Sequence, residues 1–435
     1  MLELSPHLIG LIGIAGFLML AILGLPIAFS FATMGFIGIA MLQGLAPGLY
    51  ALGEAPYQET ASYVLSTIPL FVLMGQFAYH SGISGDLFLS AYKWMGRLPG
   101  GLALATTLSC TGFAACTGSS VASAATMGTI AFPEMQKYNY SPRLAAGAIA
   151  AGGTLGILIP PSTIFIIYGI ITETSIGDLF IAGIFPGIMM SLLFCLLIYF
   201  MCRRNPALGP PSQSFAWKER FASLKKIWGM LVLFLIVILG LYFGVFAPSE
   251  AGAIGAFGAL LIALIRGRLN RTNAISAVVE TIRISCFSLF VLVGAMLFNT
   301  FISMSGLPRL LSDWVTGLPF PPFIILIIIC AFYIPLGTVI DCLPMILLTM
   351  PFVFPIIEGF GFSPVWFGVL VCVLGELSLI TPPVGINIYV VQGVTKVPLH
   401  EVAKGILPFA MVFVLGIALL IAFPQISLFL PNTMK

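Results

Sequence analysis

Polar residues that could hold a cation occur in four short segments of an otherwise strongly apolar chain. Two segments lie in the first half of the sequence and two in the second. Their hydroxyl, amide and backbone oxygens are hard donors, which suit alkali cations better than transition metals. The candidates in the first half are Gly118, Ser119, Ser120, Gly156, Pro160 and Ser162. Those in the second half are Gly337, Thr338, Asp341, Thr381, Pro382, Gly385 and Asn387.

Two acidic residues stand out because they fall inside apolar segments. Asp341 is expected at membrane depth, where an ionised Asp costs roughly 2.5–3.5 kcal/mol on insertion scales. It could be a counter-charge for a bound cation or a proton-binding group, or it could cap a hairpin by accepting backbone N–H groups. Glu376 could help to bind a cation, or it could pair with a basic side chain or a hydroxyl.

The elements that position these residues must lie in a membrane. The chain has 435 residues, of which 60% are hydrophobic and 8% charged, whereas soluble domains carry about 25% charged residues. We therefore predict an all-α polytopic membrane protein, each span needing about 20 residues. The N-terminus is interpreted as a retained span, because it has neither a basic start nor a cleavage signal. No basic stripe for nucleic acid is present.

The eight cysteines and the glycine-rich stretch 145–156 are both interpreted as packing features. No two cysteines form a CxxC pair, so they are expected to be small buried hydrophobes rather than metal ligands. The glycine-rich stretch is not followed by a Lys-Ser/Thr pair, which argues against a phosphate loop. We expect it to be a face for close helix packing.

The basic residues predict the membrane topology. Sixteen of the 18 lie in five groups, at 93–97, 137–143, 203–226, 266–283 and 396–404, and the positive-inside rule places them in the cytoplasm. About 30 mostly apolar residues separate the first two groups, so this segment must enter and return as a re-entrant hairpin. Non-helical backbone at that depth must be buried in protein or line a cavity.

The predicted organisation is two repeats, 1–201 and 229–435, joined by a cytoplasmic or interfacial linker, 202–228. The first contains a hairpin, 100–134, and a broken helix, 144–171; the second contains a hairpin, 321–357, and a broken helix, 365–392. Other spans are expected near 7–25, 27–45, 61–80, 179–201, 229–247, 250–265, 276–304 and 406–430. Five spans per repeat is an odd number, so the second repeat is expected to be inverted and both termini to face outward.

An internal repeat supports this organisation. When the sequence is compared with itself at an offset of 222 residues, seven of the 14 prolines in residues 1–213 fall on another proline. About one such match is expected by chance. The pairs are Pro26 with Pro248, Pro99 with Pro321, Pro133 with Pro355, Pro142 with Pro364, Pro160 with Pro382, Pro161 with Pro383, and Pro186 with Pro408.

Each half thus interrupts one apolar segment with a Pro-Pro pair. A simple kink is the alternative for a single copy, but two copies at equivalent positions favour functional breaks. Inverted repeats with broken helices are typical of secondary transporters, whose sites lie at the midplane between the repeats. The exposed carbonyls of a half-helix can hold a cation, and its N–H groups can hold an anion.

Four stretches carry a resemblance to a known family: GSSVASAATMGTIAFPEM, TLGILIPPSTIFIIYG, FAPSEAGAIGA and ELSLITPPVGINIYVVQGV. Together they resemble the large membrane subunit of tripartite ATP-independent periplasmic (TRAP) transporters. The resemblance implies uptake of an organic acid, such as a C4-dicarboxylate or sialic acid, across the bacterial inner membrane. It also implies an elevator-type motion, a sodium gradient as the driving force, no further cofactor, and two partners: a periplasmic substrate-binding protein and a small four-helix membrane subunit.

The resemblance also assigns the candidate residues to two sodium sites. One would lie between Gly118–Ser120 and Gly156–Ser162, and the other between Gly337–Asp341 and Thr381–Asn387. The organic acid would bind between them. In this family much of the specificity resides in the binding protein.

Three other readings remain open at the level of the residues. The nearest is a stand-alone sodium/anion symporter of related inverted-hairpin architecture. An intramembrane serine hydrolase would need a base at the depth of Ser119, but His7, His80 and His400 all lie near span ends. A channel is the third reading, and saturable uptake that depends on a binding protein would exclude it.

Overall fold

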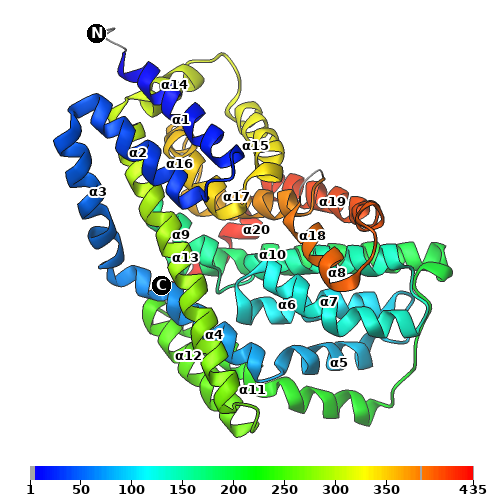
Figure 1. Cartoon of the computed structure of the whole chain (residues 1–435). Coiled ribbons are helices and arrows are strands. Elements are labelled where there is room, and N and C mark those ends of the chain that lie inside the picture. The colour runs from blue at the N-terminus through cyan, green and yellow to red at the C-terminus, as the bar shows by residue number, and fades with distance from the viewer. Residues whose placement is uncertain (1–4, 383–384, 435) are drawn as a thin grey trace.

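The structure, a computed structural model, describes residues 5–382 and 385–434, without the side chains of Glu59, Ala115 and Cys116. Within these ranges every regular element is a helix (Figure 1). The helices of the first half are α1 Pro6–Ile22, α2 Ile27–Gln43, α3 Leu45–Thr60, η1 Tyr63–Ser66, α4 Thr67–His80, α5 Ile83–Met95, α6 Gly101–Thr117, α7 Ser120–Lys137, α8 Pro142–Leu158, α9 Thr163–Ile171 and α10 Ile176–Arg204. The prediction of an all-helical membrane protein is confirmed.

The second half continues with a similar order of elements. Its helices are η2 Pro206–Leu208, α11 Trp217–Tyr242, α12 Pro248–Ile265, α13 Arg271–Met304, α14 Leu307–Thr316, α15 Pro322–Val339, α16 Cys342–Gly359, α17 Pro364–Leu379, α18 Ile386–Thr395, α19 Leu399–Ala422, α20 Gln425–Leu428 and η3 Pro431–Thr433. Seven helices in the described ranges are long and apolar enough to cross a membrane, and nine if each bent pair is one span.

The correspondence between the halves extends from the prolines to the helix bounds. Shifting α7, Ser120–Lys137, by 222 residues gives 342–359, which are the bounds of α16. The same shift brings α8 onto α17 within one residue. A duplicated backbone plan accounts for this agreement, and the opposite membrane orientation of the two copies remains a prediction.

Glycines allow the closest helix contacts in the core. A Cβ atom on Gly147 of α8 would lie 2.4 Å from the Gly405 carbonyl oxygen of α19, and one on Gly405 would lie 2.1 Å from the Arg143 carbonyl oxygen. Because no larger residue fits there, the two helices approach backbone to backbone, as small residues permit in membranes. The stretch 145–156 is buried throughout, so its interpretation as a packing face is confirmed.

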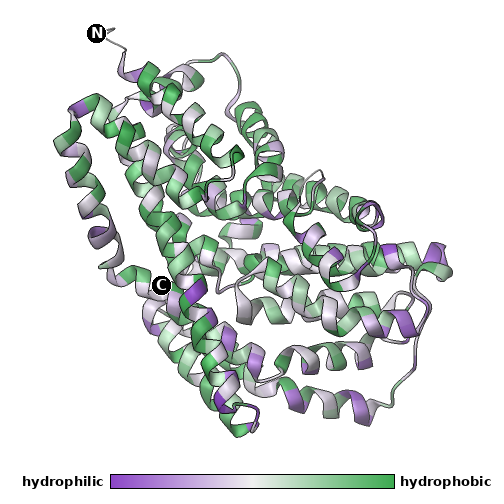
Figure 2. Ribbon diagram, viewed as in Figure 1, coloured by the Kyte–Doolittle hydropathy of each residue, from purple (hydrophilic) through white to green (hydrophobic). Residues whose placement is uncertain are grey.

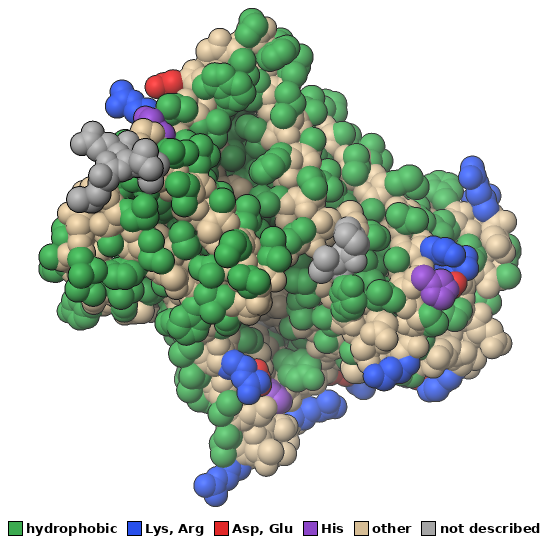
Figure 3. Space-filling view, turned by 45° about the horizontal axis from the view of Figure 1, so that its top comes forward, with side chains coloured by type: hydrophobic (Ala, Val, Ile, Leu, Met, Phe, Trp, Pro, Cys, Tyr) green, Lys and Arg blue, Asp and Glu red, His purple; other side chains and the backbone are tan. Residues whose placement is uncertain are grey.

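The outer surface is apolar over most of its area. Figure 2 shows that hydrophilic residues concentrate toward helix ends, and Figure 3 shows hydrophobic side chains covering most of one face, with many Lys and Arg side chains near its margins. Exposed large side chains such as Phe200, Leu235 and Phe290 lie on the long helices α10, α11 and α13. A hydrocarbon environment suits this surface, because apolar contact with lipid replaces contact with water.

Three helices were not predicted from the sequence: α3, α5 and α14. They have 16, 13 and 10 residues and mix polar with apolar positions, so they carry no signal of span length. The predicted linker also differs from the structure. Helix α10 continues to Arg204, and α11 begins at Trp217 and runs without a break to Tyr242, which leaves 205–216 as the connection. No proline interrupts α11, so its basic first turns and its apolar part form one helix.

Candidate functional site

The turn of the first hairpin is built from Gly118 and Ser119. Helix α6 ends at Thr117, and Gly118 follows with φ of +56°, a left-handed conformation that glycine adopts without strain. Ser119 then begins α7, and its hydroxyl oxygen accepts a hydrogen bond from the Ala122 N–H at 3.3 Å. Such a cap satisfies one of the otherwise free donors of the new helix.

This turn packs directly against the break between α8 and α9, which are bent by 44°. A Cβ atom on Gly118 would lie 2.8 Å from the Pro161 carbonyl oxygen, and one on Gly156 would lie 2.7 Å from the Ser119 carbonyl oxygen. The Thr163 hydroxyl donates to the Gly118 carbonyl at 3.3 Å. We call this assembly, residues 117–123 with 154–163, the first hairpin region.

The remaining candidates of the first half also lie here. Ser162 is fully buried and caps α9 by accepting from the Phe165 N–H at 3.4 Å. Pro160 is buried in the break itself. Ser120 is buried at the first position of α7. The six candidates thus meet in one place, although Thr163, which ties the break to the turn, was not among them.

The second hairpin region consists of residues 337–342 with 375–382 and 385–387. Helix α15 ends at Val339, and Asp341 precedes α16, where its Oδ1 accepts a hydrogen bond from the Cys342 N–H at 2.8 Å. A Cβ atom on Gly337 would lie 2.2 Å from the Ser378 hydroxyl oxygen. The second hairpin therefore packs against the end of α17, as the first hairpin packs against the end of α8.

The break of the second half lies between Leu379 and Ile386, the end of α17 and the start of α18. Pro382 and Gly385 lie within this break, whereas Pro383 lies outside the described residues. The hydroxyls of Thr338 and Thr381 donate to carbonyls of their own segments, those of Pro335 at 2.8 Å and Leu377 at 2.6 Å. These hydroxyl oxygens can still accept a cation, since each has used only its proton.

Two side chains in the second region are fully buried: Asn387, whose amide has no hydrogen-bond partner in the described part of the chain, and Glu376, whose carboxylate has no basic side chain paired with it there. Asp341 and the Ser120 hydroxyl interact electrostatically with the Glu376 carboxylate. Because Ser120 begins α7 and Asp341 precedes α16, Glu376 lies where the two hairpins approach each other. An unpaired buried charge is strongly unfavourable, so this carboxylate calls for a cation or a proton.

The second parts of the broken helices connect the two halves. Helix α9 packs against α16 and α17, whereas α18 packs against α7 and α8. The Tyr168 hydroxyl of α9 donates to the Pro364 carbonyl at the start of α17 at 2.8 Å. Each break is therefore enclosed by elements of both halves.

The donor set of this centre suits sodium. In the residues that the structure describes, no group of three or more His, Cys, Asp or Glu side chains could hold a metal ion. The available ligands are hydroxyl and carbonyl oxygens with two carboxylates nearby, which are hard donors. The sequence analysis named Glu376 as a residue that could help to bind a cation or pair with a hydroxyl, but it did not name Ser378, whose closeness to the second Pro-Pro pair was a signal that could have included it.

The arrangement of hairpins and breaks can now be compared with known proteins. A family model described as "Tripartite ATP-independent periplasmic transporter, DctM component" matches residues 14–426. The chain belongs to this family. It is a large permease subunit of a TRAP transporter, and the resemblance inferred from the four sequence stretches is confirmed.

Relatives within the DctM family differ in the substrates that their names give. The chain is 35% identical to the C4-dicarboxylate large permease DctM of Pseudomonas aeruginosa, over 86% of this chain and 88% of that protein. It is 30% identical to the sialic acid permease SiaM of Vibrio cholerae (96% and 97% covered). It is 33% identical to the ectoine permease TeaC of Halomonas elongata (94% and 96% covered).

A solved structure shares the fold of this DctM-family chain. The crystal structure of the Alcanivorax borkumensis YdaH transporter, described as having an unusual topology, superposes with a TM-score of 0.66. The similarity covers 95% of this chain and 97% of that one at 15% sequence identity. At this identity the likeness concerns the fold alone, and it supports a polytopic membrane protein.

Proposed function

We propose that this permease couples inward sodium movement to the uptake of an organic acid that a periplasmic binding protein delivers. The observation that carries the coupling is the position of Glu376, which is buried without a basic partner in the described chain and interacts with Ser120 of one hairpin and Asp341 of the other. Sodium ions held by the turn and break oxygens would balance these carboxylates. Sodium binding and hairpin position would thereby be linked, as coupling requires.

The cargo would bind between the two hairpin regions. Sodium ions there supply positive charge, and the half-helix N-termini of α9 and α18 supply N–H groups, both of which favour an anion. C4-dicarboxylates and sialic acid, which the names of two relatives give, carry carboxylates that fit this chemistry. We propose that the two hairpin regions move together against the other helices in an elevator-type transport step.

The proposed orientation places the five basic groups in the cytoplasm and both termini in the periplasm of a bacterial inner membrane. A separate small membrane subunit with four helices would complete the transporter. Part of the apolar outer surface would contact that subunit, and the rest would contact the bilayer.

Uptake in proteoliposomes tests this function. The permease, co-purified with its small subunit, is reconstituted and supplied with a binding protein and labelled succinate, sialic acid or ectoine. We expect accumulation of one of them only with the binding protein and an inward sodium gradient. Equal accumulation when potassium replaces sodium would contradict sodium coupling. Accumulation without the binding protein would instead favour a stand-alone symporter.

A further inference from the structure

A basic cavity that shares no lining residue with the hairpin regions has no role in the proposed transport step. Its volume is about 430 Å³, and it lies where α11, the end of α12 and the start of α5 meet. Its charged lining consists of Lys225, Lys226, Arg266, Arg268 and Asp86. Four bases and one acid leave three positive charges without an acidic counterpart in the lining. We call this cavity the basic pocket.

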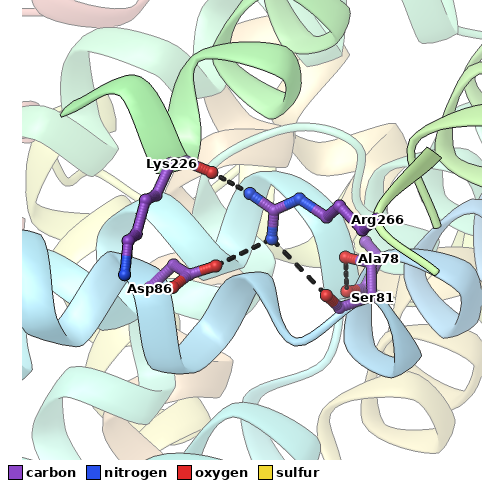
Figure 4. Close-up of polar contacts among 5 residues, drawn as sticks. All are labelled: Ala78, Ser81, Asp86, Lys226 and Arg266. Atoms are coloured by element: carbon purple, nitrogen blue, oxygen red, sulfur yellow. Dashed lines mark hydrogen bonds and ion pairs between the residues drawn. The ribbon is translucent and has the colours of Figure 1, made fainter. Parts of the chain in front are cut away.

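Two of the lining residues, Arg266 and Asp86, pair with each other (Figure 4). The Arg266 guanidinium donates to the Asp86 carboxylate at 2.8 Å and to the Ser81 carbonyl at 3.4 Å, and it also bonds the Lys226 carbonyl. This network joins α12, α5 and α11. Because Arg266 has used the only acid of the lining, its charge is balanced within the protein.

The positive charges of the other three bases are available to a ligand. Lys225, Lys226 and Arg268 are exposed and form no ion pair within the described ranges of the chain. The Arg268 guanidinium lies over Gly82, where an added Cβ would meet it at 2.1 Å. Two lysines and one arginine in the lining of one cavity are suited to a phosphate group.

The apolar residues of the lining indicate where an apolar part of the ligand would lie. Trp228 is 63% exposed and Ile265 85% exposed, and both border the pocket. Exposed Trp beside bases, at the ends of long apolar helices, is typical of the membrane–water interface. The ligand therefore presents a phosphate to the bases and hydrocarbon to Trp228 and Ile265.

We propose that the basic pocket binds the headgroup of an anionic phospholipid. Lys225, Lys226 and Arg268 contact its phosphate, and Trp228 and Ile265 contact the first methylenes of its acyl chains. Basic pockets between membrane helices on the cytoplasmic side commonly take such headgroups. The inference rests on the proposed membrane orientation, and it does not depend on the coupling ion or the cargo.

The permease is purified with its small subunit and stripped of lipid, and the test measures how far added lipid raises the melting temperature of this complex. We expect phosphatidylglycerol to raise the melting temperature and phosphatidylcholine to have little effect. The variant K225Q/K226Q/R268Q should bind phosphatidylglycerol on the order of a hundredfold more weakly, given the attraction of each base near an anionic surface. The control R203Q/R204Q/K218Q removes the same charge from exposed positions outside the pocket and should bind normally.

Three outcomes would overturn the proposal: equal stabilisation by phosphatidylcholine, equal loss in the control variant, or equal stabilisation by inorganic phosphate at the same concentration. The last would make the pocket a site for soluble anions. If the triple variant does not fold, the double variant K225Q/K226Q tests the proposal instead, because both lysines are exposed. Native mass spectrometry then counts the phosphatidylglycerol molecules that remain bound to it. Loss of sodium-driven uptake has no bearing on this result, so the two proposals fail separately.

Discussion

The two hairpin regions share a backbone plan but differ in how their polar groups are satisfied. In the first region the hydroxyls pair within the protein: Thr117 with Ser123 at 3.0 Å, and Thr154 with the Ala151 carbonyl at 2.5 Å. In the second, the Asn387 amide has no hydrogen-bond partner and the Glu376 carboxylate has no basic partner in the described chain. The shift of 222 residues places Asp341 where the first half has Ser119, and Glu376 where it has Thr154. The two regions share a helix plan, and acidic side chains occur only in the second.

This asymmetry predicts that the second region dominates cation coupling. A neutral region of satisfied hydroxyls can hold an ion through backbone carbonyls, but its binding energy changes little when one side chain is altered. A region whose carboxylates have no basic partner in the described chain loses a full charge on a single substitution. Paired substitutions at equivalent positions therefore separate the two regions.

The largest difference is expected between Asp341→Ala and Ser119→Ala. Loss of a buried counter-charge costs about 2–5 kcal/mol, so Asp341→Ala should reduce sodium-driven uptake in proteoliposomes by about thirtyfold or more while expression persists. Asp341→Asn should do the same, because it removes the charge although it keeps the side-chain shape. Ser119→Ala removes a helix cap worth about 1 kcal/mol and should leave uptake within about fivefold. Equal uptake by Asp341→Ala and the unmodified protein would remove Asp341 from the mechanism.

The second comparison pairs Glu376→Gln with Thr154→Val. The Glu376 carboxylate acts on bound cations through space, and its loss should raise the sodium concentration for half-maximal uptake by about tenfold, equivalent to about 1.4 kcal/mol. Thr154 donates only to its own helix, so Thr154→Val should leave that concentration unchanged. Sodium titrations of uptake measure both. An unchanged titration for Glu376→Gln would assign the carboxylate a structural role.

A third comparison concerns packing rather than charge. Alanine at Gly337 would place a methyl group 2.2 Å from the Ser378 hydroxyl oxygen, and overpacking of this kind costs about 1–3 kcal/mol. We expect a lower melting temperature for Gly337→Ala, and recovery in Gly337→Ala/Ser378→Gly, because position 378 would then match Gly156 of the first half. Gly118→Ala should not be recoverable through a side chain, since its obstacle is the Pro161 carbonyl oxygen.

The control for this packing prediction is Gly393→Ala, because no atom lies within 4 Å of the added methyl group. It should match the unmodified protein in thermal unfolding followed by intrinsic fluorescence. A melting temperature that falls as far as that of Gly337→Ala would show that helix glycines are needed for a reason other than space.

The sequence predicted the elements that carry strong one-dimensional signals. Pro-Pro pairs marked the break between α8 and α9, and the basic groups required a hairpin where α6 and α7 lie. Helices α5 and α14 were missed because short amphipathic helices lack span-length hydropathy. The approach of Ser120 and Asp341 to Glu376 could not be derived either. It depends on how α7, α16 and α17 pack in three dimensions, which the order of residues does not specify.

The smallest effect is expected from Thr163→Val. This change removes the 3.3 Å hydrogen bond that joins the first break to its turn, a contribution of about 0.5–1.5 kcal/mol. Amide hydrogen exchange should therefore quicken about two- to tenfold at residues 117–120 and remain unchanged at 339–341 of the second turn. Thr129→Val is the matched control, because that hydroxyl donates to the Thr126 carbonyl of its own helix at 2.7 Å. Faster exchange at both turns would mean that the two hairpin regions open together, and that their difference lies in charge alone.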